Sequence, residues 1–344
     1  MPRDHSSTDS DVQKYYGKPI DPRKFKQRDL SNLRDRVEVT RERAKEFRPR
    51  ADIEVEACPV CDSPSREVAC EMHGYEYVRC SQCTHVYLST RLPEEALLEF
   101  YQSSSDFADH YTNEEQITYR LESIIEPKIE FVLDQIGLEK GRWLDVGCGI
   151  GGSVHYLESQ GWEADGLDIS EDCVEVAADV FEVSIQQRTL EEHVATDPDP
   201  YDVVSFFGYL CLIPQPMPDL QRARDLLTEE GTVCIGEMNH DSVSTQVQTT
   251  FPDWAVRHLI PPNGMHHFTE HSLATALHST GFDRDAIWYF GLDFYEFLNH
   301  VRLAVDGFSS SPLYNYCLNN LSEFQHVIDK TEQSDYQLLV GSRR

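Results

Sequence analysis

A glycine-rich stretch at residues 147–152 directly follows an apolar run that begins at Trp143. Glycines at a strand-to-helix turn let the backbone approach a ligand closely, because no Cβ stands in the way. Asp168 lies 21 positions after Gly147, at the end of a second apolar run. A carboxylate about 20 residues after such a turn is where nucleotide-binding folds hold the ribose hydroxyls. Together the two features predict a cofactor that contains adenosine.

The glycine spacing alone fits two cofactors. Gly147, Gly149 and Gly152 match the GxGxxG pattern of dinucleotide sites, whereas Gly147, Gly149 and Gly151 match the GxGxG pattern of enzymes that use S-adenosylmethionine (SAM). Asp145 distinguishes them, because its carboxylate would repel a pyrophosphate but attract the ammonium and sulfonium groups of SAM. The sequence therefore favours SAM. The alternatives are a dinucleotide-dependent dehydrogenase and a glycine turn that binds nothing.

Residues 144–149, together with Asp168, closely resemble motifs of the class I SAM-dependent methyltransferases. The resemblance continues in the family's order over about 200 residues, from roughly 140 to the end of the sequence. The later matching stretches are 166–170, 201–208, 226–236, 268–273 and 336–341. The resemblance implies a Rossmann-like α/β fold with a seven-stranded, mostly parallel sheet.

The same resemblance implies which residues bind the cofactor. Asp145 and the glycine turn would hold the methionine end, and Asp168 would hold the ribose. By position, Thr189 and Leu190 would flank the adenine, and Phe207 would lie near the methyl group. The implied set is Asp145, Gly147, Cys148, Gly149, Gly151, Asp168, Ile169, Thr189, Leu190 and Phe207.

The catalytic base is less well defined by the sequence. Many relatives carry a Glu-His pair after the fourth strand, where this chain has residues 209–212, and a histidine after a Pro-Pro pair, where it has Asn263-Gly264. An oxygen or carbon acceptor needs a base, and histidine suits that role near neutral pH, whereas an amine acceptor needs none. For each candidate, a packing or surface role is the alternative. The candidate bases are His240, His266, His267 and Tyr209.

Two CxxC knuckles lie upstream, and 18 residues separate them. Their four cysteines are Cys58, Cys61, Cys80 and Cys83. Two such knuckles place four thiolates tetrahedrally around one metal, a spacing typical of structural zinc sites. The intervening segment is too short and polar to form a core, so the metal would supply folding energy, on the order of 10 kcal/mol. Rubredoxin-like iron and disulfides are the alternatives.

The knuckles also resemble the zinc-binding leader of certain methyltransferases. These include sugar C-methyltransferases and relatives encoded with polysaccharide genes. The large C-terminal domain of the sugar enzymes is missing here, so the resemblance leaves the acceptor open. Cys70, His73 and His85 lie near the knuckles but are not needed as ligands, because four cysteines already complete the coordination shell.

The chain is strongly acidic. It has 60 acidic and 30 basic residues, a net charge of −30, and only eight of the basic residues are lysines. An excess of carboxylates keeps a protein solvated where salt screens charge, so we expect adaptation to a salt-rich cytoplasm. Residues 1–50 differ from the rest, with a net charge of +5. We expect this arm to dock on the acidic body, with RNA binding as the alternative.

The predicted organisation has four parts. A basic, partly disordered arm with a helix over 28–48 occupies residues 1–52, with disorder predicted over 1–22. A zinc ribbon follows at 53–92, a helical linker at 93–138, and the methyltransferase domain at 139–344, with insertions near 239–269 and 293–334. A helix is predicted over 114–136, with Pro127 kinking or dividing it. Strands are predicted near 142–147, 163–168, 182–186, 202–207 and 232–237. No run of 18 apolar residues occurs, so we expect a cytoplasmic protein without a membrane segment.

The predicted function is methyl transfer from SAM, by in-line displacement, to a small-molecule or glycan-type acceptor. An RNA methyltransferase with a zinc ribbon stays open as an alternative. So does a non-catalytic protein that keeps the fold for interactions, an idea motivated by the missing Glu-His pair and opposed by the intact Asp145 and Asp168. The insertions are candidates for shaping the acceptor pocket or a homodimer contact.

The charge excess gives the first testable prediction. Because like charges repel at low salt, the thermal unfolding midpoint should rise continuously between about 0.1 and 1 M KCl, as the Debye length falls from about 10 to about 3 Å. Scanning calorimetry over this range measures the effect. A midpoint that does not change, or that falls, would contradict adaptation to high salt.

Overall fold

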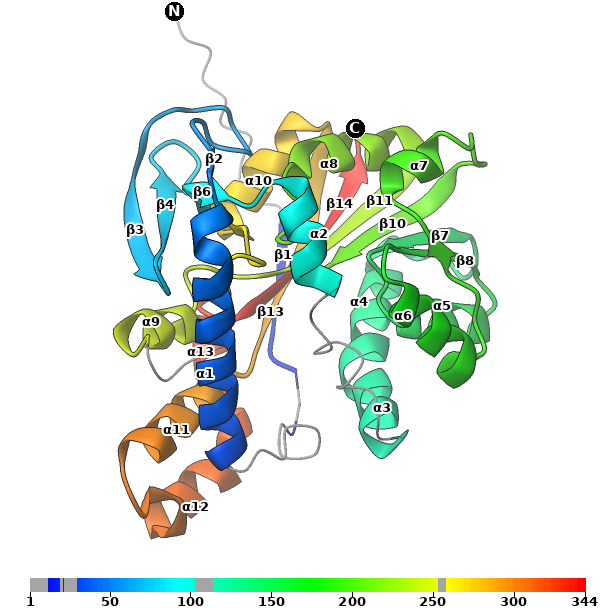
Figure 1. The fold of residues 1–344 in the computed structure, drawn as a ribbon. Helices are drawn as coiled ribbons and strands as arrows, with labels where there is room; N and C mark the ends of the chain where they lie inside the picture. The colour runs from blue at the N-terminus through cyan, green and yellow to red at the C-terminus, as the bar shows by residue number, and fades with distance from the viewer. Residues whose placement is uncertain (1–11, 19–20, 22–29, 103–113, 253–257) are drawn as a thin grey trace, which may run out of the picture.

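An eight-stranded sheet forms the centre of the protein (Figure 1). The structure is a computed structural model that describes residues 12–18, 21, 30–102, 114–252 and 258–344. The strand order is β1-β13-β14-β11-β10-β7-β8-β9, in which only β14 runs antiparallel to its neighbours. The strands are β1 Gln13–Tyr16, β7 Arg142–Val146, β8 Glu163–Asp168, β9 Gln186–Gln187, β10 Tyr201–Phe207, β11 Leu227–Met238, β13 Phe282–Phe290 and β14 Tyr336–Arg343.

This is the predicted Rossmann-like fold, with one strand more than the seven expected. The additional strand β1 pairs in parallel with the edge strand β13. It lies inside the segment 1–22 that was predicted to be disordered, so that prediction is wrong for residues 13–16; residues 1–11, 19–20 and 22 lie outside the described part. Aromatic contacts order this strand in spite of its polar sequence. Tyr15 meets Phe131 at 5.1 Å between ring centroids, and Tyr16 stacks on Tyr289 at 6.1 Å.

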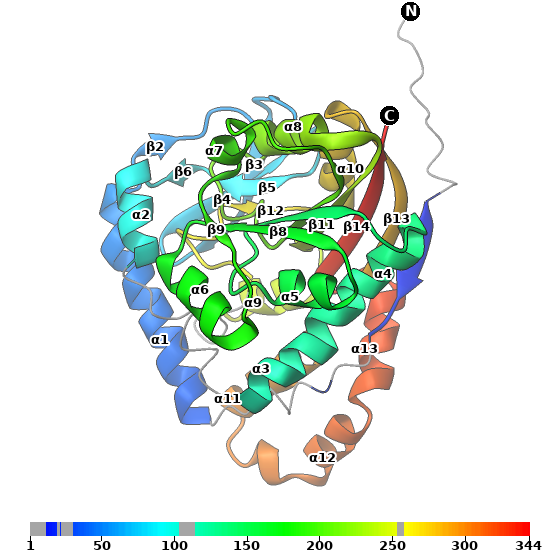
Figure 2. The ribbon, with the colours of Figure 1, turned by 90° about the vertical axis from the view of Figure 1, so that its right-hand side faces the viewer.

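Helices cover both faces of the sheet (Figure 2). Alternate residues of a strand point to opposite faces, so Trp143 packs on the face of α4 and α5, and Leu144 on the face of α7, α8 and α10. Val203 and Val204 divide in the same way. The helices on the sheet are α4 Glu126–Ile136, α5 Gly152–Ser159, α6 Glu171–Val176, α7 Leu190–Val194, α8 Pro216–Leu226 and α10 Glu270–Ser279.

The helix predicted over 114–136 is divided, as expected near Pro127. It consists of α3 (Glu114–Arg120), a π-helical turn (Leu121–Ile125) and α4, with Pro127 in the first turn of α4. The strand predicted near 182–186 is wrong for most of its length, because only Gln186–Gln187 pair with β8. Val183 and Ile185 are buried there by packing against α5 and α6 rather than by strand pairing.

A second, four-stranded antiparallel sheet forms the cysteine-containing ribbon. Its order is β12-β5-β4-β3, with β3 Arg66–Met72, β4 Tyr75–Cys80, β5 Val86–Leu88 and β12 His266–His267. A short pair, β2 (Ile53–Glu54) with β6 (Thr90–Arg91), closes its base. Because β12 comes from the 239–269 insertion, the ribbon and the large domain share one sheet.

Two helices pack beside the ribbon. The first is α1 (Leu30–Phe47), which agrees with the helix predicted over 28–48, and the second is α2 (Glu94–Gln102). Phe47 of α1 meets Phe100 of α2 at 5.2 Å between ring centroids, and Arg50 pairs with Glu99 at 2.7 Å. Part of the basic arm therefore docks on the protein itself.

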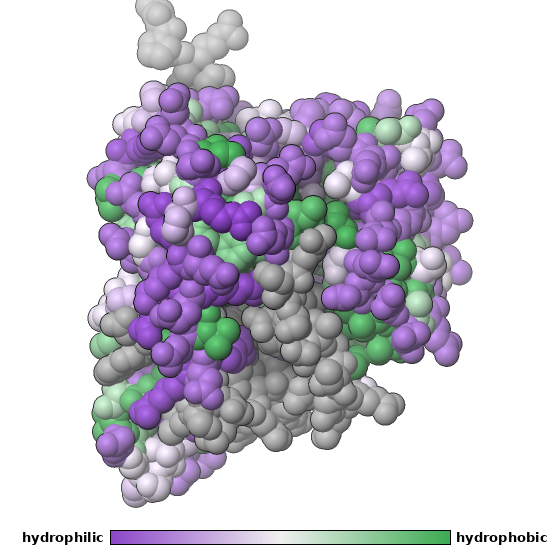
Figure 3. All heavy atoms as spheres, in the orientation of Figure 1, coloured by the Kyte–Doolittle hydropathy of each residue, from purple (hydrophilic) through white to green (hydrophobic). Residues whose placement is uncertain are grey.

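The insertions are helical. They contain α9 (Val243–Thr250), α11 (Asp293–Ala304), α12 (Pro312–Asn319) and α13 (Leu321–Lys330). Within the described ranges, none of the helices combines the length and the hydropathy that crossing a lipid bilayer requires. Hydrophilic side chains cover most of the described surface in Figure 3, and hydrophobic ones form small separate areas.

Candidate functional site

The glycine turn joins β7 to α5 at the carboxyl edge of the sheet. Gly147 and Cys148 donate their amide hydrogens to Leu167 O at 2.8 and 3.0 Å, which ties the turn to the end of β8. Gly147 has φ +70°, and a Cβ there would lie 2.5 Å from Cδ2 of Tyr209. Gly151 has φ +75°, and a Cβ there would lie 2.9 Å from Val183. Only glycine meets both constraints.

Asp168 is a hydrogen-bond acceptor at the end of β8. Its Oδ2 accepts from Gly149 N at 2.9 Å and its Oδ1 from Ser170 N at 3.0 Å. A carboxylate has about four acceptor positions, so two remain for ribose hydroxyls. Burial raises the pKa of Asp168. The next residue, Ile169, exposes 52% of its surface, an open apolar contact beside the carboxylate.

The two residues predicted to flank the adenine differ in their placement. Thr189 is the N-cap of α7 and forms a capping box with Glu192, in which Thr189 N donates to the Glu192 carboxylate at 2.8 Å. Leu190 is 1% exposed and packs in the core beneath α7. Thr189 is therefore exposed at the edge of the site, whereas the Leu190 side chain faces away from solvent.

Asp145 is buried beneath the turn. Its Oδ1 accepts from Ser205 Oγ at 2.7 Å and its Oδ2 from Ser153 Oγ. Burial raises the pKa of Asp145 to about 6, a cost that the two serines and the nearby Lys128 partly offset. Cys148 beside it is half-buried, and the loss of solvation raises the pKa of its thiol, which makes it a poor nucleophile.

Lys128 is a further residue of the site, which the sequence motifs did not indicate. From α4, its Nζ lies 4.6 Å from the ring centroid of Phe207 and 5.5 Å from that of Tyr336. Burial lowers the pKa of Lys128 to about 8, against the opposing effect of Asp145. The sequence feature that could have indicated this residue is a single lysine among the apolar residues of the helix predicted over 114–136. The site thus contains a carboxylate and an ammonium group that influence each other's pKa.

Open space lies just beyond the end of β10. Gly208 has φ +74°, and a Cβ there would meet no atom of the described residues within 4 Å beyond its neighbours in the chain. The next residue, Tyr209, lies against Gly147 and donates its hydroxyl hydrogen to Asp219 at 2.7 Å. Burial and Asp219 raise the pKa of Tyr209. Tyr209 is therefore placed as a wall of the site, with its hydroxyl group turned toward α8.

The three candidate histidines lie together, but beside the ribbon rather than on the glycine turn. His266 Nδ1 is 3.1 Å from Nε2 of His85, and the rings of His240 and His267 are 6.1 Å apart. Burial lowers the pKa values of His240 and His266 to about 4, so both rings are neutral at pH 7. Within the described structure, His240 Nδ1, His266 Nε2 and both ring nitrogens of His267 lack a hydrogen-bond partner.

A further buried carboxyl group, Glu237, lies near the end of β11. It is 0% exposed, and its Oε1 accepts from Cys211 N at 3.3 Å, which fixes the loop after β10. Its Oε2 has no partner among the described residues. Burial raises the pKa of Glu237 to about 7. The sequence feature that could have indicated Glu237 is a single carboxylate in the apolar run 232–238, and it was not used as a prediction.

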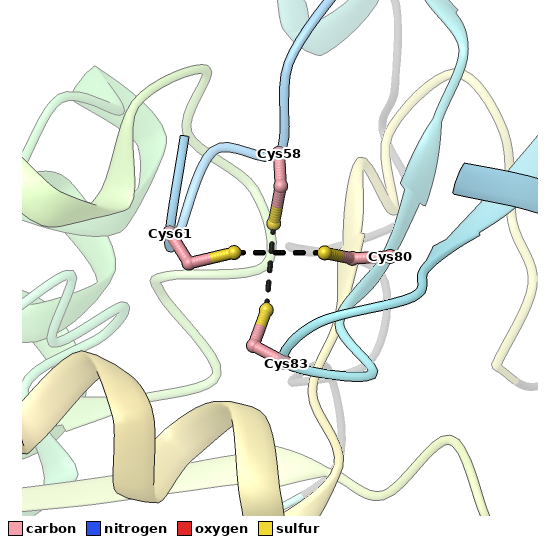
Figure 4. A group of neighbouring side chains, drawn as sticks. All are labelled: Cys58, Cys61, Cys80 and Cys83. Carbon is pink, nitrogen blue, oxygen red and sulfur yellow. Dashed lines mark hydrogen bonds between the residues drawn. The ribbon is translucent and has the colours of Figure 1, made fainter. Parts of the chain in front are cut away.

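The four knuckle cysteines converge on one point (Figure 4). Their sulfur atoms all lie within 4.8 Å of one another, and the Cys58–Cys83 and Cys61–Cys80 pairs are each 3.5 Å apart. Tetrahedral zinc–thiolate bonds of 2.3 Å place sulfur atoms about 3.8 Å apart. All four thiols are free of disulfides. The group therefore fits one tetrahedral metal ion.

The ribbon contacts the loops at the carboxyl edge. Thr84, next to the second knuckle, meets Thr269 at 2.7 Å between hydroxyl oxygens, and Arg79 pairs with Asp241. Tyr77 donates to Gly264 O at 2.9 Å. The loop after β10 is held from the same side, because Arg91 and Tyr101 donate to backbone carbonyl groups of that loop, each at 2.9 Å.

Comparison with known proteins identifies the large domain. The family described as "Methyltransferase domain" matches residues 115–286, half of the chain. The chain belongs to this methyltransferase family. It is a SAM-dependent methyltransferase, as the cofactor motifs predicted. The ribbon lies outside the matched residues, apart from β12.

Curated relatives carry the same activity in their names. Ubiquinone biosynthesis O-methyltransferase of Xanthomonas campestris pv. campestris (strain B100) is 22% identical over 187 residues, covering 52% of this chain and 77% of the relative. The protein of that name from Aeromonas salmonicida (strain A449) is 31% identical over 120 residues, covering 33% of this chain and 50% of the relative.

Solved structures with a similar fold include a SAM-dependent methyltransferase from Archaeoglobus fulgidus. It is 19% identical, with a TM-score of 0.46, and covers 67% of this chain and 97% of its own. Magnesium protoporphyrin IX methyltransferase from Synechocystis PCC 6803, solved with bound SAH, is 14% identical with a TM-score of 0.44. That match covers 67% of this chain and 87% of the other.

Glu237 gives a prediction for stability against pH. Its folded-state pKa of about 7 lies above the ordinary 4.5, so the folded state binds this proton more tightly than the unfolded state. This proton adds about 3 kcal/mol to the free energy of unfolding. The whole contribution is present below pH 4.5, and it is lost as the pH rises through 7. Glu237→Gln should reduce that decline by a similar amount.

Urea unfolding at several pH values measures how steeply the free energy of unfolding falls with pH. The matched control is Glu229→Gln on the exposed part of the same strand, which should keep the wild-type pH dependence. If the free energy of unfolding fell equally with pH in the wild type and in Glu237→Gln, Glu237 would not be the cause of the decline.

Proposed function

We propose that this methyltransferase moves the methyl group of SAM to a small-molecule or glycan-type acceptor that binds beyond the ends of β10 and β11. The observation that carries the cofactor part is the placement of Asp145 and Asp168 at the ends of adjacent strands, with the glycine turn between them. The supporting rule is that ligands of open α/β sheets bind outside the carboxyl ends of the strands.

The cofactor's charges would match the site. Asp145 would attract the ammonium group of the methionine end, and Lys128 would neutralise the α-carboxylate. Asp168 would accept hydrogen bonds from the ribose hydroxyls, and Ile169 and Thr189 would contact the adenine. The open space at Gly208 is where the sulfonium methyl group would face the acceptor.

The reaction is an in-line displacement. A lone pair of the acceptor forms a bond to the methyl carbon as the carbon–sulfur bond breaks. That bond's electron pair stays on sulfur, so S-adenosylhomocysteine (SAH) leaves. Because SAM is already activated, alignment by the protein supplies much of the catalysis.

An acceptor hydroxyl group must also lose its proton. Two groups near the end of β11 are candidates to take it: the unpartnered ring of His267 and the unpartnered Oε2 of Glu237. The pKa of Glu237, about 7, matches a base that works near neutral pH. His240 and His266 stay candidates for positioning the acceptor.

The ribbon would hold a structural zinc ion, which fixes the knuckles and thereby the strand beside β12. The names of the relatives, which are O-methyltransferases of ubiquinone biosynthesis, support a small-molecule acceptor but do not identify it. An RNA acceptor is disfavoured because a net charge of −30 repels phosphates. The intact cofactor motifs disfavour a non-catalytic role.

The test is calorimetric titration of zinc-loaded protein in molar KCl with SAM, SAH and NAD. Both adenosyl ligands should bind and NAD should not. Asp168→Ala removes the charged acceptor of two ribose hydroxyls and should weaken SAH binding by at least about a hundredfold. The control Asp179→Ala changes an exposed carboxylate after α6 and should bind normally. Binding of NAD alone, or undiminished SAH binding by folded Asp168→Ala, would overturn the assignment.

A further inference from the structure

A groove of about 500 Å³ opens between the ribbon and helix α9, in addition to the cofactor site. Its ribbon side is formed by Cys70 of β3 and Arg79 of β4, and its opposite side by His240, Gln246 and other residues that follow β11. Strand β3 and α9 lie side by side on the same flank of the molecule (Figure 1). The groove therefore depends on the ribbon for one of its walls.

Most of the described side chains that line the groove are polar, and together they carry no net charge. Its charged groups are Arg79 and Asp241, which pair with each other across the boundary between ribbon and domain. Gln246 and Gln333 line it with exposed side-chain amides that make no hydrogen bond within the described structure, and Thr249 adds a hydroxyl group. An anionic ligand would find no unpaired cation here, because Arg79 is already paired.

The lining also lacks an apolar wall. Among the described residues, no aromatic ring other than that of His240 and no aliphatic side chain larger than alanine lines the groove. An isoprenoid tail or a quinone ring would bury its surface against amides and hydroxyl groups, without hydrophobic gain. Amides and hydroxyl groups instead pair well with the hydroxyl groups of a sugar.

The inner end of the groove is formed by a neutral imidazole ring. His240 lines the groove, and burial lowers the pKa of its ring to about 4, so the ring is uncharged at pH 7. Its Nδ1 is buried and has no partner within the described structure, so this nitrogen does not face the groove. The ring therefore offers the ligand an uncharged contact surface.

The groove lies on the acceptor side of the cofactor site. His240 follows the end of β11 by two residues, and β11 is the direct neighbour of β10, beyond which Gly208 leaves open space. A substituent held in the groove is thus beyond the carboxyl edge of the sheet, where acceptors of this fold class are presented to the cofactor.

We propose that this groove is the acceptor subsite, and that it binds an uncharged, polyhydroxylated group of the pyranose type. The inference rests on the proposed function and specifies its acceptor class. The ribbon is then a wall of the binding site, with Arg79 and Asp241 closing the boundary between the two parts. Gln246 and Gln333 hold the outer hydroxyl groups of the ligand, and the ring of His240 contacts its inner end.

The test uses saturation-transfer NMR on zinc-loaded, SAH-saturated protein in molar KCl. The probes are the methyl glycosides of glucose, galactose, mannose and rhamnose, with catechol as an aromatic probe. At least one glycoside should bind at millimolar concentration. The double variant Gln246→Ala/Gln333→Ala, which alters exposed side chains only, should weaken its binding about tenfold or more through two lost hydrogen bonds. The control Gln160→Ala, at the end of α5, should bind as wild type.

Calorimetry with SAH on the same samples separates the possible failures. Normal SAH binding with no bound glycoside, or with equal glycoside binding by the double variant, would overturn the subsite and leave the methyltransferase assignment intact. Catechol binding that the double variant loses would overturn the ligand class. Failure of the folded protein to bind SAH would overturn the proposed function, and the subsite with it.

Discussion

The antiparallel pairing of β5 with β12 is the contact on which the acceptor side of this protein depends. It joins Val86 and Tyr87, just after the second knuckle, to His266 and His267 in the insertion after β11. Strand β12 is only two residues long, and β5 follows directly from the metal-binding knuckle and is held on its other edge by β4. The Thr84–Thr269 contact reinforces the pairing at 2.7 Å. The geometry of the knuckle is therefore transmitted to the candidate histidines through backbone hydrogen bonds.

The two halves of the site are consequently built by different means. The cofactor half depends on the large sheet alone, since Asp145, Asp168 and the glycine turn are tied together by hydrogen bonds between β7, β8 and α5. The acceptor half uses short strands and loops, and it contains buried ionisable groups such as Glu237, for which the described part of the chain provides no ion pair. Such groups lower stability, and enzymes keep them where function needs them. A metal-held ribbon suits that half, because it supplies order that the loops lack.

Much of the cofactor half could be predicted from sequence, because spacing along one chain segment fixes it. The glycine turn and Asp168 are local signals, and alternating apolar runs placed β7, β8 and β10 within one residue, whereas β11 begins five residues before the predicted start. Strand β1 was missed because its order comes from pairing with β13, some 270 positions away, which no local pattern encodes. Lys128 and Glu237 were missed for a related reason: each looked like an ordinary charged residue until the fold buried it. The shared sheet of ribbon and domain was equally invisible, since two residues of β12 carry no periodicity.

The most direct test of this account is hydrogen–deuterium exchange on zinc-loaded and chelator-treated protein, with SAH binding measured on both. If the knuckle positions the acceptor side, removing the metal should increase exchange across 264–269, while 144–149 stays protected and SAH still binds. Unchanged protection of 264–269 after verified metal loss would contradict the central claim that the ribbon builds the acceptor half. If metal removal abolished both SAH binding and the protection of the glycine turn, the cofactor half would not be independent of the ribbon.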